Sequence, residues 1–245
     1  MSRFTVATQS NSHSFHLADP CDTCRARDFS ACAPLDAEEQ SRLTAITRTV
    51  QATPHRAIFE EGDPADNVYT LTAGAVKIYK SLPDGRRQIT GFLFPGDFLG
   101  LTHNESHAYS AEALTLTRLC RFPRRRLEAL LDEIPRLEQQ LLRMASHELA
   151  AAQAQIMLLG RKSARERLVS FLLMLSNGAV RRGQRGDPVS LPMNRSDIGD
   201  YLGLTIETVS RTLTKLKTTG LIELLDDKQI HLAKPEALRE IAEGF

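Results

Sequence analysis

The sequence has almost no net charge. Its 245 residues include 31 Lys and Arg against 30 Asp and Glu, which gives a formal net charge of +1 at pH 7. A uniformly basic chain, the usual electrostatic signature of a nucleic-acid-binding protein, is therefore excluded. Any positively charged surface that attracts nucleic-acid phosphates must therefore be confined to one part of the molecule.

Long apolar runs are also missing. The N-terminal stretch MSRFTVATQSNSHSF contains no apolar segment of signal-peptide length, and no later stretch approaches the roughly 18 apolar residues of a membrane span. We therefore expect a cytoplasmic protein with no membrane partner.

Patterns typical of catalysis are absent from the sequence as well. We find no nucleophile paired with a base, no phosphate-binding glycine loop and no histidine-rich metal motif. The expectation is that the protein is not an enzyme.

Cysteine is scarce, and its placement is informative. Cys21, Cys24 and Cys32 fall in the segment CDTCRARDFSAC, which is too polar to form a core, and Cys120 follows much later. A reducing cytoplasm disfavours structural disulfides. The pattern therefore favours metal or redox chemistry.

The stretch from Asn194 to Lys217 has the pattern of a helix-turn-helix. Asn194, followed three positions later by Asp197, is typical of a helix start, and Gly203 interrupts the apolar spacing that follows. We place the turn at Gly203 and begin a second helix near Thr205. The expected inward face of this second helix consists of Ile206, Val209, Leu213 and Leu216.

The outward face of the second helix has the composition of a base-reading surface. Glu207, Ser210 and Arg211 share this face near the helix N-terminus. In a helix-turn-helix this part enters the major groove, where Arg bonds guanine and a carboxylate accepts from cytosine. A merely solvated charged face is the alternative. We assign further DNA contacts, including phosphate-binding cations, to Thr208, Lys215 and Lys217.

Residues 49–123 have the texture of a β-rich domain. Short β-branched and aromatic runs alternate with glycines about a dozen residues apart, which predicts an antiparallel roll or barrel. The sequence LPDGRR predicts a hairpin turn at Asp84-Gly85. After Gly220, the sequence LIELLDDKQIHL predicts two strands joined at Asp226-Asp227, which would form a wing.

Between the roll and the helix-turn-helix lies a helical pattern with two apolar stripes. No charged residue occurs between Leu149 and Gly160, so this helix should be buried against something. Met144, Ala151 and Leu158 form one stripe. The other has heptad spacing and predicts pairing with a second copy, against the alternative that it packs only on its own domain. This predicted dimer seam comprises Leu142, Ala145, Leu149, Ala152, Ile156 and Leu159.

Taken together, these features resemble the CRP/FNR family of transcription regulators. The pattern E-x-x-S-R, here Glu207, Ser210 and Arg211, is similar to the FNR and FixK branch, which reads TTGAT-type inverted repeats. The resemblance implies a homodimeric activator that works with RNA polymerase on genes of low-oxygen metabolism. The implied fold is α+β: a tail and cysteine arm (1–35), a β-roll like that of cyclic-nucleotide-binding domains (36–133), a dimerisation helix (134–161) and a winged helix-turn-helix (162–245).

The resemblance also implies a cofactor. FNR proteins bind an oxygen-sensitive [4Fe-4S] cluster through an N-terminal cysteine group and one cysteine at the end of the roll, positions that correspond here to Cys21, Cys24, Cys32 and Cys120. The spacing C-x2-C-x7-C is longer than the C-x2-C-x5-C of the enterobacterial protein and is similar to the rhizobial type. Zinc on the same thiolates is one alternative. A cluster-free FixK-like regulator controlled by thiol state or expression level is another.

A cyclic nucleotide is not expected as a ligand. The stretch PGDFLGLTHNESHAYSAEA, where the cyclic-AMP branch binds the ligand's phosphate, contains no Arg or Lys. The phosphate would lack a compensating cation. We interpret Gly96-Asp97 as a turn.

Overall fold

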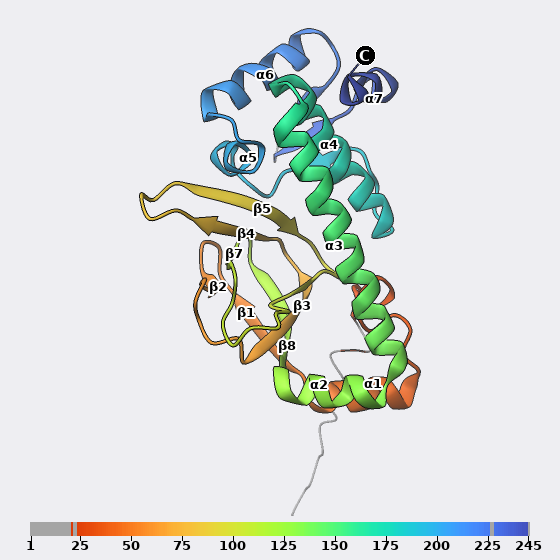
Figure 1. Cartoon of the computed structure of the whole chain (residues 1–245). Coiled ribbons are helices and arrows are strands. Elements are labelled where there is room, and N and C mark those ends of the chain that lie inside the picture. The colour runs from red at the N-terminus through yellow and green to blue at the C-terminus, as the bar shows by residue number, and fades with distance from the viewer. Residues whose placement is uncertain (1–20, 22–23, 226–227, 245) are drawn as a thin grey trace, which may run out of the picture.

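The structure, a computed structural model, describes Cys21, residues 24–225 and residues 228–244. A β-roll, a long helix and a C-terminal helix-turn-helix domain follow one another along the chain (Figure 1), so the predicted α+β fold is confirmed. Within these described residues, no helix is both long and apolar enough to cross a membrane.

The roll consists of two four-stranded antiparallel sheets, in the strand orders β1-β8-β3-β6 and β2-β7-β4-β5. Buried apolar side chains such as Leu71, Val76 and Leu119 fill the space between them. The predicted turn at Asp84-Gly85 joins β4 to β5, and Gly85 has the positive φ, 86°, that such turns favour. The strands are β1 (Arg48–Ala52), β2 (Ala57–Phe59), β3 (Asn67–Ala73), β4 (Val76–Ser81), β5 (Arg87–Leu93), β6 (Phe98–Leu99), β7 (Ser110–Ala113) and β8 (Thr117–Pro123).

Helices flank the roll on the side of the cysteine segment. A short 3-10 helix, η1 (Arg27–Phe29), leads into α1 (Ala37–Ala45), whose first turn is capped by Asp36. After the roll come α2 (Arg124–Glu133) and the 27-residue α3 (Pro135–Arg161), which runs past the roll to the DNA-binding domain (Figure 1).

The C-terminal domain has a buried core, to which Phe171, Ile198, Leu202 and Leu216 contribute fully buried side chains, and this core continues into the roll through Ile89 and Phe92 of β5. Strands β10 and β11 pair as the predicted wing, and the expected connection at Asp226-Asp227 lies outside the described residues. The elements are α4 (Ala164–Arg181), β9 (Val189–Ser190), α5 (Arg195–Leu202), α6 (Ile206–Thr218), β10 (Glu223–Leu225), β11 (Gln229–His231) and α7 (Pro235–Glu243).

The two apolar stripes of α3 differ in burial. On the predicted seam, Leu142, Leu149 and Ile156 are 70%, 62% and 70% exposed, so the described residues do not cover them. Leu159 departs from the expectation because it packs against the core of the DNA-binding domain. On the other stripe, Met144 and Leu158 face the chain's own cores, whereas Ala151 is exposed. The remaining seam residues, Ala145 and Ala152, are exposed.

Candidate DNA interface and cysteine pocket

The helix-turn-helix is built by two capped helices. The Asn194 side chain accepts a hydrogen bond from the Asp197 backbone N–H (2.8 Å), and the Asp197 carboxylate accepts one from the Asn194 N–H (3.2 Å), so the capping box fixes the start of α5. Gly203, with φ of 62°, ends α5, and the Thr205 side chain caps α6. The predicted helix, turn and helix are confirmed.

The inward face of α6 matches the prediction except at its start. Val209, Leu213 and Leu216 are buried, but Ile206 is 46% exposed, so the assignment of Ile206 to the inward face was wrong. Ile206 is the first residue of α6. Its spacing follows the apolar pattern, yet the buried face of α6 begins only one turn later, at Val209.

The outward face of α6 presents polar side chains to solvent. Glu207, Arg211 and Thr214 are exposed. Hydrogen bonds from its own backbone N–H and from Thr205 lower the pKa of Glu207, which keeps this side chain a carboxylate acceptor. Lys215 and Lys217 are exposed near the end of α6.

Two polar residues of α6 are only partly available. The Ser210 hydroxyl accepts a hydrogen bond from Arg195 Nη1 of α5 at 3.1 Å, and Thr208 Oγ1 lies 3.1 Å from the Thr205 hydroxyl. Arg195 was missed by the sequence reasoning, although an arginine at the first position of the first helix is a signal that could have found it.

The four cysteines line a single pocket. Cys21, Cys24 and Cys32 approach it from the N-terminal arm, defined here as residues 21–35, and Cys120 approaches it from β8, where its register partner on β3 is Thr70. Cys32 and Cys120 are 88 residues apart in the sequence, and the fold brings both to the same pocket. Other residues that line it are Ala26, Arg27, Ser30, Gln40, Thr72 and Phe122.

The pocket is apolar and tightly closed. Burial raises the pKa of Cys32 to about 11, against the opposing effect of a hydrogen bond with Ser30, and the nearby Cys21 and Cys24 raise it further. The cavity volume is about 20 Å³, roughly the space of one water molecule. Across the described ranges, no three Cys, His, Asp or Glu side chains are arranged closely enough to hold a metal ion.

One hydroxyl beside the cysteines is unsatisfied. Thr70 is buried and lines the pocket, and its Oγ1 has no hydrogen-bond partner among the described residues. A buried hydroxyl without a partner is costly, and Thr70 therefore has a hydrogen bond to offer to a group bound in the pocket.

Comparisons with known proteins agree with this architecture. Residues 49–133 match the family described as "Cyclic nucleotide-binding domain", and residues 166–241 match "Crp-like helix-turn-helix domain". Both matches fall on elements already described, the first on the roll and α2, the second on the helix-turn-helix and wing.

Individual relatives extend the similarity over most of the chain. The nitrogen fixation regulation protein FixK of Bradyrhizobium diazoefficiens is 40% identical over 205 residues, which cover 84% of this chain and 86% of FixK. The transcriptional activator protein Anr of Pseudomonas aeruginosa is 34% identical over 227 residues, or 91% and 93% of the two chains. The structure of FixK2 from Bradyrhizobium japonicum superposes with a TM-score of 0.75 at 38% identity and covers 80% of this chain and 97% of FixK2. These relatives are regulators, in agreement with the expectation that the chain is not an enzyme.

Proposed function

The chain belongs to the CRP/FNR family of DNA-binding transcription regulators, and from this premise we propose that it is an oxygen-responsive member that holds a [4Fe-4S] cluster and binds TTGAT-type inverted repeats as a homodimer. The observation that carries the proposal is that Cys21, Cys24, Cys32 and Cys120 line one pocket although the sequence separates the arm from β8. Its targets would be genes of low-oxygen metabolism.

The donor set fits such a cluster in kind. Four thiolates are the usual complement of a [4Fe-4S] cluster. Arg27 lines the same pocket and would offset part of the thiolates' negative charge, and the unsatisfied Thr70 hydroxyl could donate to sulfur. When bound, the cluster would supply an oxygen-sensitive link between the arm and β8.

The cavity can hold a cluster only if the arm moves. A cavity of about 20 Å³ holds roughly one water molecule, so binding requires the arm to lie farther from β8 than it does here. This tight closure favours a second candidate, the cluster-free regulator controlled by thiol state or expression level. A third candidate is a zinc ion bound by the same four thiolates.

The arm is connected to the start of α3, so its position bears on the dimer helix. Ala31 and Leu35 of the arm belong to the same buried cluster as Leu137 and Leu141 of α3. The Gln140 side chain of α3 also donates a hydrogen bond to the Ser30 carbonyl at 3.1 Å. A shift of the arm therefore changes the support of α3 in the five residues that lead into the seam at Leu142.

The exposed seam supports the homodimer. Leu142, Leu149 and Ile156 form an apolar row at heptad spacing that solvent would otherwise cover, and a second copy of α3 matches that spacing. Pairing would place two α6 helices on successive major grooves, about 34 Å apart. We extend the proposal to RNA polymerase as a partner, and to the absence of a cyclic-nucleotide ligand because residues 95–113 contain no Lys or Arg.

Titration of an inverted TTGAT repeat with anaerobic protein tests this proposal. We expect tight binding without oxygen, weak binding after exposure to air, and no comparable binding to a scrambled repeat at the same salt concentration. Equal affinity before and after air would favour the cluster-free candidate. Equal affinity for the repeat and the scrambled DNA would refute the assignment of the bases read.

A further inference from the structure

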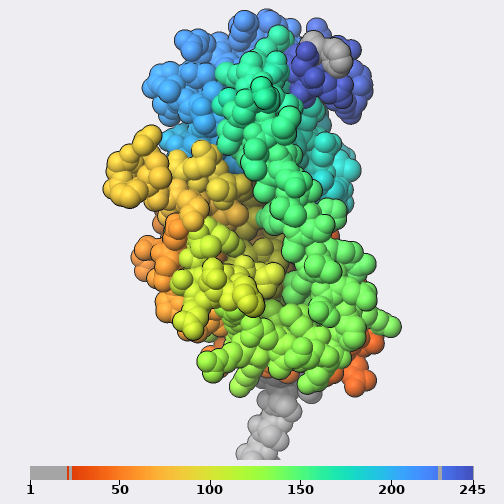
Figure 2. Space-filling view, viewed as in Figure 1, coloured from red at the N-terminus to blue at the C-terminus, as the bar shows by residue number. Residues whose placement is uncertain are grey.

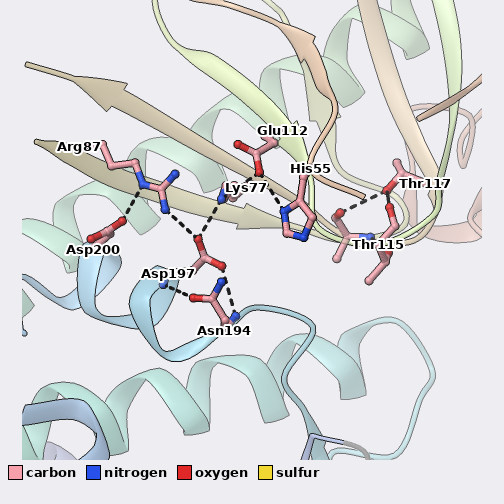
Figure 3. Close-up of polar contacts among 10 residues, drawn as sticks. His55, Lys77, Arg87, Glu112, Thr115, Thr117, Asn194, Asp197 and Asp200 are labelled. Carbon is pink, nitrogen blue, oxygen red and sulfur yellow. Dashed lines mark hydrogen bonds and ion pairs between the residues drawn. The ribbon is translucent and has the colours of Figure 1, made fainter. Parts of the chain in front are cut away.

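The roll reaches into the helix-turn-helix through a buried ion pair. Lys77 of β4 is 3% exposed, and its Nζ lies 2.9 Å from an Asp197 carboxylate oxygen of α5, itself 1% exposed, and 3.1 Å from Glu112 of β7. Figure 3 shows Lys77 directed between these two carboxylates. The pair joins residues 120 positions apart in the chain.

Strand β5 adds further contacts to the same helix. Arg87 donates from Nε to Asp200 at 2.7 Å and from Nη2 to Asp197 at 3.3 Å (Figure 3). The Gln88 side chain donates to the backbone carbonyls of Asp200 (2.6 Å) and Tyr201 (3.2 Å). We call Lys77, Arg87, Gln88, Asp197 and Asp200 the roll–α5 lock.

The lock specifies one arrangement of the two domains. Burial opposes the charge of Arg87, but its hydrogen bond with Asp200 and the charges of Asp200, Asp197 and Glu112 outweigh this and raise its pKa. A buried charge that loses its partner is strongly unfavourable. Even a small displacement lengthens and so weakens a charge-assisted hydrogen bond. The geometry therefore penalises any rotation of α5 away from the roll.

Asp197 has a second task that connects the lock to DNA recognition. Its carboxylate also accepts the Asn194 N–H in the capping box of α5. Since α5 packs on α6 through their shared core, a fixed α5 also fixes α6. The contacts lie on α5 and leave Glu207, Arg211 and Thr214 of α6 exposed, so the locked arrangement is compatible with DNA binding.

We propose that Lys77 and Arg87 of the roll are positioning residues for DNA recognition, which hold α5 and thereby α6 at a fixed place relative to α3. This inference rests on the proposed binding of an inverted repeat by a homodimer. In such a dimer the place of α6 on each α3 sets the separation of the two α6 helices. The lock therefore determines how strictly the protein discriminates between half-site spacings.

A charge swap at the half-exposed edge of the lock tests this role. Arg87→Glu and Asp200→Arg should each weaken binding to the preferred repeat by about 5- to 150-fold, the usual range for coupling between sites. Each should also reduce the penalty for inserting one base pair between the half-sites. The double variant Arg87→Glu with Asp200→Arg should restore part of the affinity and of the spacing preference, because the new carboxylate at position 87 would still lie near Asp197.

The matched control is Arg86→Glu, which makes the same charge change one residue away. Arg86 pairs with Asp84 at the hairpin tip and not with α5, so we expect wild-type binding. The proposal is overturned if Arg87→Glu weakens all spacings equally, if it binds like the wild type, or if the swap restores nothing.

A second variant tests the lock without DNA. Lys77→Met should separate thermal unfolding of the helix-turn-helix domain from that of the roll in calorimetry of the full chain. Lys80→Met, on the same strand but paired with Glu61 inside the roll, should leave their coupling unchanged. Identical traces for Lys77→Met and the wild type would overturn the lock. A wild type that binds no inverted repeat would instead refute the proposed function, and the calorimetric result would still stand.

Discussion

The cysteine pocket and the roll–α5 lock are both places where distant parts of the chain meet, but they differ in completeness. In the lock, the carboxylates of Asp197 and Asp200 have cationic partners at hydrogen-bond distance. In the pocket, the Thr70 hydroxyl lacks a partner among the described residues, and Cys32 is a thiol whose pKa burial raises. Among the described residues the lock is therefore complete, whereas the pocket keeps an unsatisfied hydroxyl, to which the proposed cluster would supply a partner.

Removal of one pocket thiol should have the largest effect. We expect Cys120→Ser to abolish both the brown colour of anaerobic protein and its specific DNA binding, because a serine hydroxyl is a poor substitute for a thiolate ligand. Absorbance and DNA titration of the same sample measure both. If Cys120→Ser keeps its iron and its DNA affinity, Cys120 is not a cluster ligand and the proposed link between the arm and β8 fails.

Disruption of the seam should come next. Ile156→Glu should leave a folded protein that is monomeric, because a carboxylate facing its symmetry mate would be desolvated and repelled. DNA affinity should fall with dimerisation. Ala154→Glu is the control, since Ala154 is exposed on the same helix but lies off the seam. Analytical ultracentrifugation that finds both variants dimeric would move the interface elsewhere.

A smaller, sequence-specific effect is expected at α6. Arg211→Ala should cost about 1–3 kcal/mol of binding free energy in each half-site if Arg211 bonds guanine bidentately. Lys217→Ala should weaken all sequences alike and reduce the salt dependence by about one unit. Titrations on matched and mutated repeats over several salt concentrations separate the two. Were Arg211→Ala to behave as Lys217→Ala, Arg211 would be a phosphate contact.

The smallest expected effect tests whether the arm packs against the roll. Gly96 has φ of 103°, and an added Cβ would overlap the Phe29 ring of the arm, whereas Gly62, with φ of 92°, has no atoms within 4 Å of such a Cβ. Both Ala variants carry backbone strain, but only Gly96→Ala should pay an additional overpacking cost, about 1–3 kcal/mol of unfolding free energy. Denaturant unfolding of the two variants measures this difference. Equal destabilisation would mean that the arm is not seated on the roll at Phe29.

The sequence predicted what local patterns determine. The capping box at Asn194, the turn at Gly203 and the hairpin at Asp84-Gly85 depend on residues a few positions apart, and all three occur in the structure. The motif of four cysteines pointed to a common site, and the pocket brings these residues together without the spacing of a metal centre.

The sequence could not predict what depends on contacts between domains. Lys77 reads as an ordinary charged residue on a strand, but in the structure it is buried and paired with Asp197 of α5. Leu159 fits the heptad spacing, yet it packs against the core of the DNA-binding domain, while Ile206 fits the inward spacing of α6 and is 46% exposed. In each case the periodicity was correct and the neighbour was set by tertiary packing.

The most direct test of the central claim is the absorbance spectrum and iron content of protein purified without oxygen, measured with DNA binding before and after exposure to air. We predict a brown protein with about four iron ions per chain, whose colour and specific DNA binding are lost together in air. A colourless anaerobic protein that binds the inverted repeat equally well before and after air would contradict the account.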